Sequence, residues 1–373
     1  MNESYRILLA SEPVFGSSAR GVLAGLRRLG NEVTSANYRE IIPKVTTRRL
    51  KLLRRLLLPW YVRDYNNYLL AMHDLARPEI FLAVKGQYML PETLREFRER
   101  GTRTYDYYPD VSAFTHDKYI PKAVPEYDHV FTTKSFQLRD FPERLGVRSI
   151  SFIPHGYDPD VYRPHDLTEW DRRQYAADVC FIGSHTAQKE ELIGAIARSL
   201  PDVRLKIWGN LWAGRCRGPE LRRAVTGRPL YGLAYAKAVR ASKICLGINS
   251  EVVAGASSGD LMSQRSFEVP ASGGFLLHDR NEEVRCFYVE GEEMACFEGP
   301  AELAAKVRYY LRHPERRRAI AAAGHRRCVP AYSYDERMKQ LLRFHAQASG
   351  PARRPPRSPG RPSEEPSCTT VMS

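Results

Sequence analysis

The chain has 373 residues, 43% hydrophobic and 27% charged, a composition typical of globular proteins and a length that favours two domains over one. The formal net charge of +14 favours an anionic partner, such as a nucleotide, a nucleic acid or a membrane surface. No apolar run approaches the ~20 residues that cross a bilayer. We expect a cytoplasmic protein whose seven scattered cysteines are buried thiols and form neither disulfides nor a zinc site.

Strand-like apolar runs alternate with helical patterns through the first 155 residues. The expected strands start near positions 6, 32, 79, 103, 128 and 148, and the expected helices cover 19–29, 91–100 and 135–145. Such alternation predicts a parallel sheet with helices on both faces. Gly16 is the single glycine in residues 12–18, which follow the first strand, and this excludes a three-glycine dinucleotide fingerprint.

A second alternation follows a segment rich in proline and aspartate around 154–164. Its expected strands are 178–183, 204–209, 243–249 and 275–277, and its expected helices are 189–200, 235–241, 301–313 and 314–328. We therefore predict an α/β protein with two Rossmann-like, doubly wound domains that face a central cleft. The predicted domains are 1–155 and 176–347, with a linker over 156–175 and a disordered tail rich in Pro, Arg and Ser over 348–373.

Residues 47–60 have the pattern of a basic amphipathic helix. Most apolar residues gather on one side of a helical wheel and most basic residues on the other: Leu50, Leu53, Leu56, Leu57 and Trp60 against Arg48, Lys51, Arg54 and Arg55. Two interpretations stay open. The helix buries its leucines in the first domain, which we favour, or it lies on an anionic membrane surface as a peripheral helix at the inner face. Nucleic acid is the weaker candidate partner, because the sequence contains no recognised nucleic-acid-binding motif.

Five short segments follow one another in a specific order over about residues 100–340. They read YYPD at 107–110, IPHGYD at 153–158, FIGS at 181–184, KICLGIN at 243–249 and QRSFEVPASGG at 264–274. Together they resemble bacterial glycosyltransferases of two-Rossmann-domain (GT-B) architecture, specifically the CgeB/YkvP spore-protein-like family. The resemblance implies transfer of a sugar, hexosyl-like, from a nucleotide-diphosphate sugar to an acceptor hydroxyl in cell-surface, spore or secondary-metabolite glycan assembly. It implies neither a cofactor nor a metal.

Glutamates with seven residues between them mark the donor site in that clan of enzymes. The resemblance implies that Glu268 binds the ribose hydroxyls and that Asp260, in place of the first glutamate, contacts the donor sugar. A carboxylate suits the ribose role because it accepts two charge-assisted hydrogen bonds from a vicinal diol.

Further donor-site candidates follow from the charge and position of the diphosphate. Basic side chains and backbone N–H groups at strand ends and helix starts suit an anion, although each basic residue is equally consistent with a solvated surface position. Asn249 either holds the loop before Asp260 or touches the donor. The full set of further donor-binding candidates is Arg265, Lys189, His185, Gly183, Ser184, Asn249, Ser272, Gly273 and Gly274.

The acceptor, a glycan, a lipid-linked molecule or a protein, is expected on the first domain near Gly16, Ser17, Lys85 and Gln87. An enzyme that inverts the anomeric centre needs a base near the acceptor hydroxyl, and Asp110 and then His116 are the candidates. Asp110 is also consistent with a helix cap or a turn.

The Asp-x-Asp sequence at Asp158 and Asp160 lies in a proline turn, and we do not expect it to bind a metal. Two other functions stay open: a nucleotide-sugar epimerase of the same architecture, and an inactive protein that binds a nucleotide or glycan.

Overall fold

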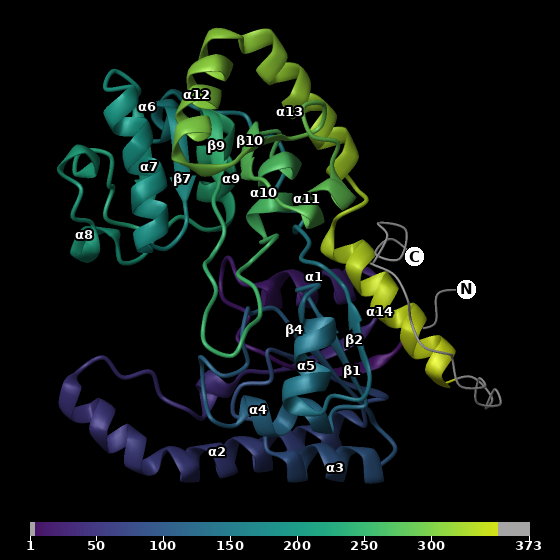
Figure 1. Ribbon diagram of the computed structural model, residues 1–373. Helices are drawn as coiled ribbons and strands as arrows, with labels where there is room; N and C mark the ends of the chain where they lie inside the picture. Colours follow the sequence, from purple (N-terminus) through teal and green to yellow (C-terminus); the bar gives the residue numbers. More distant parts are fainter. Residues whose placement is uncertain (1–3, 350–373) are drawn as a thin grey trace.

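In a computed structural model, which describes residues 4–349, the chain forms two parallel β-sheets (Figure 1). The first sheet has the strand order β2-β1-β3-β4-β5-β6 and the second has the order β11-β10-β9-β7-β8. Each order reverses once, between β1 and β3 in the first sheet and between β7 and β9 in the second. The predicted α/β class with two doubly wound domains is confirmed.

The first sheet is buried on both faces. Its strands are β1 Arg6–Ala10, β2 Glu32–Ala36, β3 Ile80–Val84, β4 Arg103–Tyr108, β5 His129–Thr132 and β6 Ile150–Phe152. Side chains alternate along a strand, so Ile7 and Leu9 pack with Val22 on one face while Leu8 packs with Leu69 on the other. Strands buried on both faces read as continuous apolar runs, which is why the sequence revealed them.

The helices of this domain are α1 Ser18–Arg28, α2 Arg48–Ala76, α3 Pro91–Glu99, α4 Ile120–Ala123 and α5 Gln137–Leu145, with 3-10 turns at Tyr38–Glu40 and Val124–Glu126. Helix α2 is 29 residues long, about 43 Å at 1.5 Å per residue. Its second half packs on the sheet through Val62, Tyr65 and Leu69. Its first half extends past the body of the domain (Figure 1).

The second sheet comprises β7 Ala177–Ile182, β8 Leu205–Trp208, β9 Ser242–Gly247, β10 Leu276–Asp279 and β11 Ala295–Phe297. Around it lie α6 Glu169–Tyr175, α7 Ala187–Ser199, α8 Trp212–Arg215, α9 Gly232–Ala241, α10 Arg265–Ala271, α11 Glu282–Phe287, α12 Gly299–Arg312 and α13 Pro314–Cys328, with a 3-10 turn at Pro219–Leu221. Val179 and Phe181 face one core cluster and Cys180 and Ile182 the other, so this sheet is also covered on both sides.

The last helix, α14 Tyr334–Ser349, returns to the first domain (Figure 1). Met338 and Leu341 complete the core around Val22. Gly21 lets α14 approach, because a Cβ there would lie 2.2 Å from the Tyr334 ring. The predicted second domain, 176–347, includes residues 334–347, and the predicted tail includes 348 and 349; both segments belong to this helix. The remainder of the predicted tail lies outside the described residues.

The described residues were searched for disulfides, membrane-spanning helices and metal-binding clusters. The six cysteines within residues 4–349 are free thiols, four of them buried. In the same range, no helix has the length and apolar character required to cross a membrane. No group of three or more His, Cys, Asp or Glu side chains among the described residues is arranged to hold a metal ion.

Candidate active site

Two adjoining cavities lie between the domains, where the strands of both sheets end. The first cavity, of about 200 Å³, is lined by Gly16, Tyr162, Ile182, Gly183, Ser184, Gly209, Asn210, Pro229, Leu230, Tyr231, Tyr235, Ser263, Gln264, Arg265 and Glu268. The second cavity, of about 390 Å³, is lined by Glu12, Val14, Ser17, Ser18, Ala19, Tyr38, Val84, Lys85, Gln87, Pro109, Asp110, Val111, Lys134, His155, Ser250, Asp260, Ser263 and Gln264. Each lies at the point where the strand order of one sheet reverses, the usual ligand position in such sheets.

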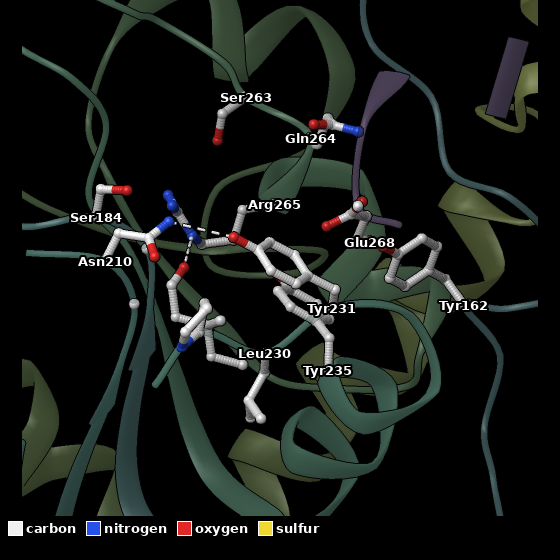
Figure 2. Close-up of a pocket in the computed structure, with 15 residues that line it drawn as sticks. Tyr162, Ser184, Asn210, Leu230, Tyr231, Tyr235, Ser263, Gln264, Arg265 and Glu268 are labelled. Carbon is white, nitrogen blue, oxygen red and sulfur yellow. Dashed lines mark hydrogen bonds between the residues drawn. The ribbon is translucent and has the colours of Figure 1, made fainter. Parts of the chain in front are cut away.

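Glu268 is the one carboxylate of the first cavity. It comes from α10 and is only 6% exposed, and Figure 2 shows it beside Tyr162 at the cavity wall. Burial raises the pKa of Glu268 to about 7, although Tyr162, Arg265 and Tyr235 favour its charged form. The phenol of Tyr235 has no hydrogen-bond partner by geometry among the described residues. Glu268 is therefore a buried acceptor that an incoming donor group would stabilise.

Arg265 is partly engaged by the backbone. Its Nε donates to the carbonyl of Ile182 at 3.0 Å and its Nη1 to that of Ile248 at 3.1 Å, at the ends of β7 and β9. Gly183 leaves room for the guanidinium, because a Cβ there would lie 2.7 Å from Nη2. The predicted phosphate ligand thus lies on the wall of the first cavity while also joining two strand ends.

Aromatic side chains, among them Tyr231 and Tyr235, form part of the wall of the first cavity. The Asn210 side chain donates to the Tyr231 hydroxyl at 3.2 Å (Figure 2). Gly209 is required there, because a Cβ would lie 1.9 Å from the carbonyl oxygen of Gly183. Gly16 of the first domain meets the same wall, since its Cβ would lie 2.5 Å from the Tyr231 ring. Gly16, which was predicted on the acceptor side, thus lies against the first cavity.

The segment after β7 carries three further donor candidates, which separate in space. Ser184 lines the first cavity. Lys189 is buried between the strand ends, 3.5 Å from the Ser250 hydroxyl. Burial, with Arg265 nearby, lowers the pKa of Lys189 to about 8. His185 lines neither cavity, because its Nε2 lies 2.6 Å from the Glu190 carboxylate and its ring packs on Trp212.

Asn249 binds the segment that carries Asp260 and lines neither the first nor the second cavity. Its side-chain nitrogen donates to the carbonyl of Leu261 at 2.7 Å and to Asp279 at 3.1 Å. Ser272, Gly273 and Gly274 lie outside the lining of both cavities. A helix that follows a strand starts at the carboxyl edge of the sheet and ends at the opposite edge. The start of α10 therefore faces the cleft, whereas its glycine end leads into β10.

The second cavity contains an ion-pair cluster around Asp110. Its Oδ2 lies 2.6 Å from Lys85 Nζ and 2.9 Å from His116 Nε2. Burial acts against ionisation, yet His116 and Lys85 hold the pKa of Asp110 well below its usual range. Lys85 lies in a left-handed turn with φ of 77°, a conformation that costs energy and is enriched at functional sites. The structure thus brings three predicted residues together, with His116 behind the cavity wall.

A second charged cluster joins the two domains. Lys134, from the turn after β5, is only 2% exposed, and its Nζ lies 2.5 Å from Asp260 of the second domain. The same ammonium group donates to the Met262 carbonyl at 3.2 Å and lies 3.2 Å from His155 Nε2. Burial and Lys134 keep the pKa of His155 well below its usual range, so its ring is neutral. Asp260 is therefore held by the first domain.

The loop after β9 reaches across the cleft beside this pair (Figure 1). Ser112 donates to the carbonyl of Ala254 at 2.7 Å, and the Ser257 N–H donates to Asp140 at 2.7 Å. Lys134 was not among the site residues predicted from the sequence. The signal for Lys134 was its position directly after a strand end.

Other polar groups complete the second cavity or lie apart from it. The Tyr38 hydroxyl donates to Glu12 and to Gln87, the latter at 3.1 Å. Ser17 both lines the cavity and caps α1. Asp158 and Asp160 pair with Arg28 at 3.0 and 2.6 Å and line neither the first nor the second cavity.

Comparison with known proteins adds to this geometry. The model of a family described as “Glycosyl transferase-like” matches residues 185–343, a segment that contains Asp260, Arg265 and Glu268. No curated protein matches the chain. Among solved structures, it resembles sucrose-phosphate synthase from Thermosynechococcus elongatus with a TM-score of 0.67 and 12% identity, over 92% of this chain and 100% of that one.

Two more structures show the same architecture. HepE from Anabaena in complex with UDP-glucose has a TM-score of 0.63 and 11% identity, over 92% of this chain and 100% of that one. The fold is GT-B. A putative UDP-N-acetylglucosamine 2-epimerase from Listeria monocytogenes has a TM-score of 0.55 and 10% identity, over 93% of this chain and 98% of that one. The fold thus includes both enzyme classes weighed from the sequence.

Proposed function

We propose that this protein is a glycosyltransferase that moves a sugar, of the hexosyl class, from a nucleotide-diphosphate sugar to an acceptor hydroxyl. The observation that carries the proposal is Glu268, a buried carboxylate in the first cavity at the strand-order reversal of the second sheet. It lies within the segment that matches the Glycosyl transferase-like family. The UDP-glucose in the HepE structure supports the same class of donor.

In this proposal the nucleotide occupies the first cavity. Glu268 accepts hydrogen bonds from both ribose hydroxyls, and the base lies against Leu230 and Tyr231. The diphosphate lies near Arg265 and the start of α7, where the helix dipole favours an anion. Lys189, buried behind this segment, adds positive charge. These groups would meet the charge of the diphosphate without a metal ion.

The sugar then points to the junction of the cavities, at Ser263 and Gln264, with the acceptor in the second cavity. The acceptor oxygen forms a bond to the anomeric carbon, and the bond from that carbon to the phosphate oxygen breaks. The acceptor proton passes to a base or to the departing diphosphate. Asp260, held by Lys134, lies on the sugar side of this junction.

Asp110 is the acceptor-side acid of the proposal, and His116 orients it from behind. Since Lys85 and His116 stabilise its carboxylate, Asp110 is a weak proton acceptor and a good hydrogen-bond acceptor for a hydroxyl. This favours a role in positioning the acceptor, with the proton leaving on the diphosphate, which is the course expected of a retaining enzyme. The resemblance to the CgeB/YkvP family supports a cytoplasmic role in cell-surface, spore or secondary-metabolite glycan assembly.

The test is nucleotide binding by Glu268→Gln, which keeps the shape of the side chain but not its charge. Calorimetry with UDP and other nucleoside diphosphates should give an affinity at least a hundredfold lower for the variant, a loss of about 2.7 kcal/mol. Glu282→Gln, at an exposed acid of α11, is the matched control. Equal affinity in the two variants would remove Glu268 from the donor site.

A nucleotide-sugar epimerase is the alternative function, because an epimerase structure shares this fold. An epimerase converts the nucleotide sugar without an acceptor, so NMR of the donor incubated alone separates the two classes. A new sugar stereoisomer still attached to the nucleotide would replace the transferase proposal. A binding protein without activity would retain nucleotide affinity and give neither product.

A further inference from the structure

The first part of α2 presents its apolar side to solvent. We call residues 48–60 the front of α2. Six large apolar side chains there are exposed by 37% to 68%: Leu50, Leu52, Leu53, Leu56, Leu57 and Trp60. The favoured expectation from sequence, a helix over 47–60 that buries these leucines in the domain, is therefore wrong. The part of α2 that packs on the sheet, through Val62, Tyr65 and Leu69, lies further along the helix. Contiguous apolar patches on a globular surface mark interaction sites.

The apolar side is turned away from the protein body. Leu58 packs against the first-domain core and Arg54 donates to the Tyr88 hydroxyl at 3.0 Å, so these two residues mark the inner side of the front. Leu53, Leu57 and Trp60 lie on a different arc of the helix, at 100° per residue. Figure 1 shows the front extending beyond the sheet, with no helix or strand of residues 4–349 over it.

The charge of the front selects the kind of partner. Arg48, Arg49, Lys51, Arg54 and Arg55 lie within it, and no acidic residue occurs from 41 to 63. A second copy of this chain, with net charge +14, would bring like charges together. An anionic lipid surface complements both properties, because the leucines enter the headgroup boundary while long basic side chains reach the phosphates. Trp60 suits the same boundary.

We propose that the front of α2 docks on an anionic lipid bilayer and holds the second cavity beside it. This deepens the proposed function, on which it rests, by naming the class of acceptor: a hydroxyl carried by a membrane-held molecule. A short chain of contacts joins the two places. Tyr88, which accepts from Arg54, packs edge-on against Tyr38 with ring centroids 5.2 Å apart, and Tyr38 bonds Gln87 in the second cavity.

Vesicle flotation of the full chain tests the docking. The protein should float with vesicles of 30% phosphatidylglycerol in phosphatidylcholine, and not with phosphatidylcholine alone. Binding should weaken with salt. The triple variant Leu53→Ser, Leu56→Ser, Trp60→Ser and the double variant Lys51→Gln, Arg55→Gln should each lose at least tenfold in vesicle affinity.

Matched controls come from exposed residues elsewhere. Leu75→Ser removes an 80% exposed leucine from the far end of the same helix, and Arg222→Gln with Arg223→Gln removes two exposed charges from the second domain. Both controls should float like the natural protein. Equal losses in the controls and the front variants would mean general charge attraction and would overturn a specific docking helix.

The depth of Trp60 provides a second measurement. Brominated lipids should quench tryptophan fluorescence in the natural protein, and Trp60→Phe should remove that quenching. Flotation without quenching would overturn insertion of the apolar side. No flotation, with a dimer that the triple variant converts to a monomer in light scattering, would assign the front to a second copy of the chain instead.

The membrane docking and the proposed donor site can be tested independently of each other. The front variants should keep the nucleotide affinity of the natural protein in calorimetry, since they lie outside the first cavity. Nucleotide binding without vesicle binding overturns the docking alone. Vesicle binding without binding of any nucleotide or nucleotide sugar overturns the proposed donor site.

Discussion

The two cavities of the cleft share Ser263 and Gln264 but are built from different chemistry. The first holds a single acid, Glu268, and a single base, Arg265, among aromatic and backbone groups. The second contains Glu12, Lys85, Asp110, Lys134, His155 and Asp260, most of them in ion pairs. A site with one buried acid that is not in an ion pair suits a fixed ligand such as a nucleotide. A site of preformed ion pairs suits the positioning of a polar group.

The largest effect should follow from Lys134→Met, which removes one partner of a buried ion pair. Asp260, only 12% exposed, would lose its cation, and the free energy of unfolding should fall by about 3 kcal/mol. If the two cavities act separately, nucleotide affinity should stay within about twofold of the natural value while sugar transfer declines strongly.

Chemical denaturation and calorimetry measure both quantities for Lys134→Met, with the exposed Lys122→Met as control. If nucleotide affinity fell as much as sugar transfer, the two cavities would not act separately, and Lys134 would belong to the donor site.

The pH dependence of stability should report Glu268. Its pKa is about 7 in the folded protein and ordinarily 4.5, so the folded state binds this proton more tightly than the unfolded state. The contribution is fully present below about pH 4.5 and is lost as the pH rises to 7. It amounts to about 3 kcal/mol at 1.36 kcal/mol per pH unit.

Glu268→Gln should lack this fall, so the difference between the two denaturation curves against pH isolates one group. Nucleotide binding should also release a proton near pH 7, visible as a buffer-dependent enthalpy. Parallel stability curves for both proteins would contradict a raised pKa at Glu268.

A smaller effect should follow from Gly16→Ala, at the place where the first domain touches the first cavity. Gly16 has φ of 80° and its Cβ would meet Tyr231. We expect about tenfold weaker nucleotide binding, or about 1.4 kcal/mol. Gly30→Ala is the matched control, because φ there is 85° but nothing lies within 4 Å of its Cβ. If Gly16→Ala and Gly30→Ala had equal nucleotide affinities, the contact between residue 16 and Tyr231 would have no effect on nucleotide binding.

The smallest effect should come from Tyr235→Phe. The lost hydroxyl favours the charged form of Glu268, so nucleotide affinity at pH 7 should fall by about threefold, or ~0.7 kcal/mol. Titration across pH should find the optimum displaced to higher pH. Tyr157→Phe, which removes another buried hydroxyl that has no hydrogen-bond partner in residues 4–349, should leave both unchanged.

Much of the fold could be predicted because both sheets are buried on both faces and their strands are plain apolar runs. The return of α14 could not, since helical periodicity at Met338 and Leu341 does not say which sheet they cover. The same limit explains α2: the helical wheel separated leucines from arginines but did not reveal that, among the residues the structure describes, the apolar side of the front stays exposed.

The site was predictable where chemistry follows a strand end. Asp110 and Lys85 were predicted by that rule, whereas Asp260 was predicted from the family resemblance, and the three lie in one cavity. Lys134 follows a strand end too, but a single lysine in a turn is more often solvated, and its burial depends on Asp260 of the other domain. The Leu230 and Tyr231 wall lies in an irregular loop without periodicity, so local patterns gave no signal for it.

The return of α14 also reverses the order in which the domains become complete during synthesis. The second domain has its last core residues at Cys328 and Tyr332, whereas the first domain lacks Met338 and Leu341 until the end of α14 has been made. The chain passes between the domains twice, near Tyr157 and near Tyr332, and these two segments lie side by side. The Tyr157 N–H donates to the Tyr332 carbonyl at 3.2 Å, and the Tyr334 N–H donates to the Tyr157 carbonyl at 2.9 Å. The second domain is therefore an insertion with adjacent ends. Although it comes later in the chain, it is the part that can finish folding first on the ribosome.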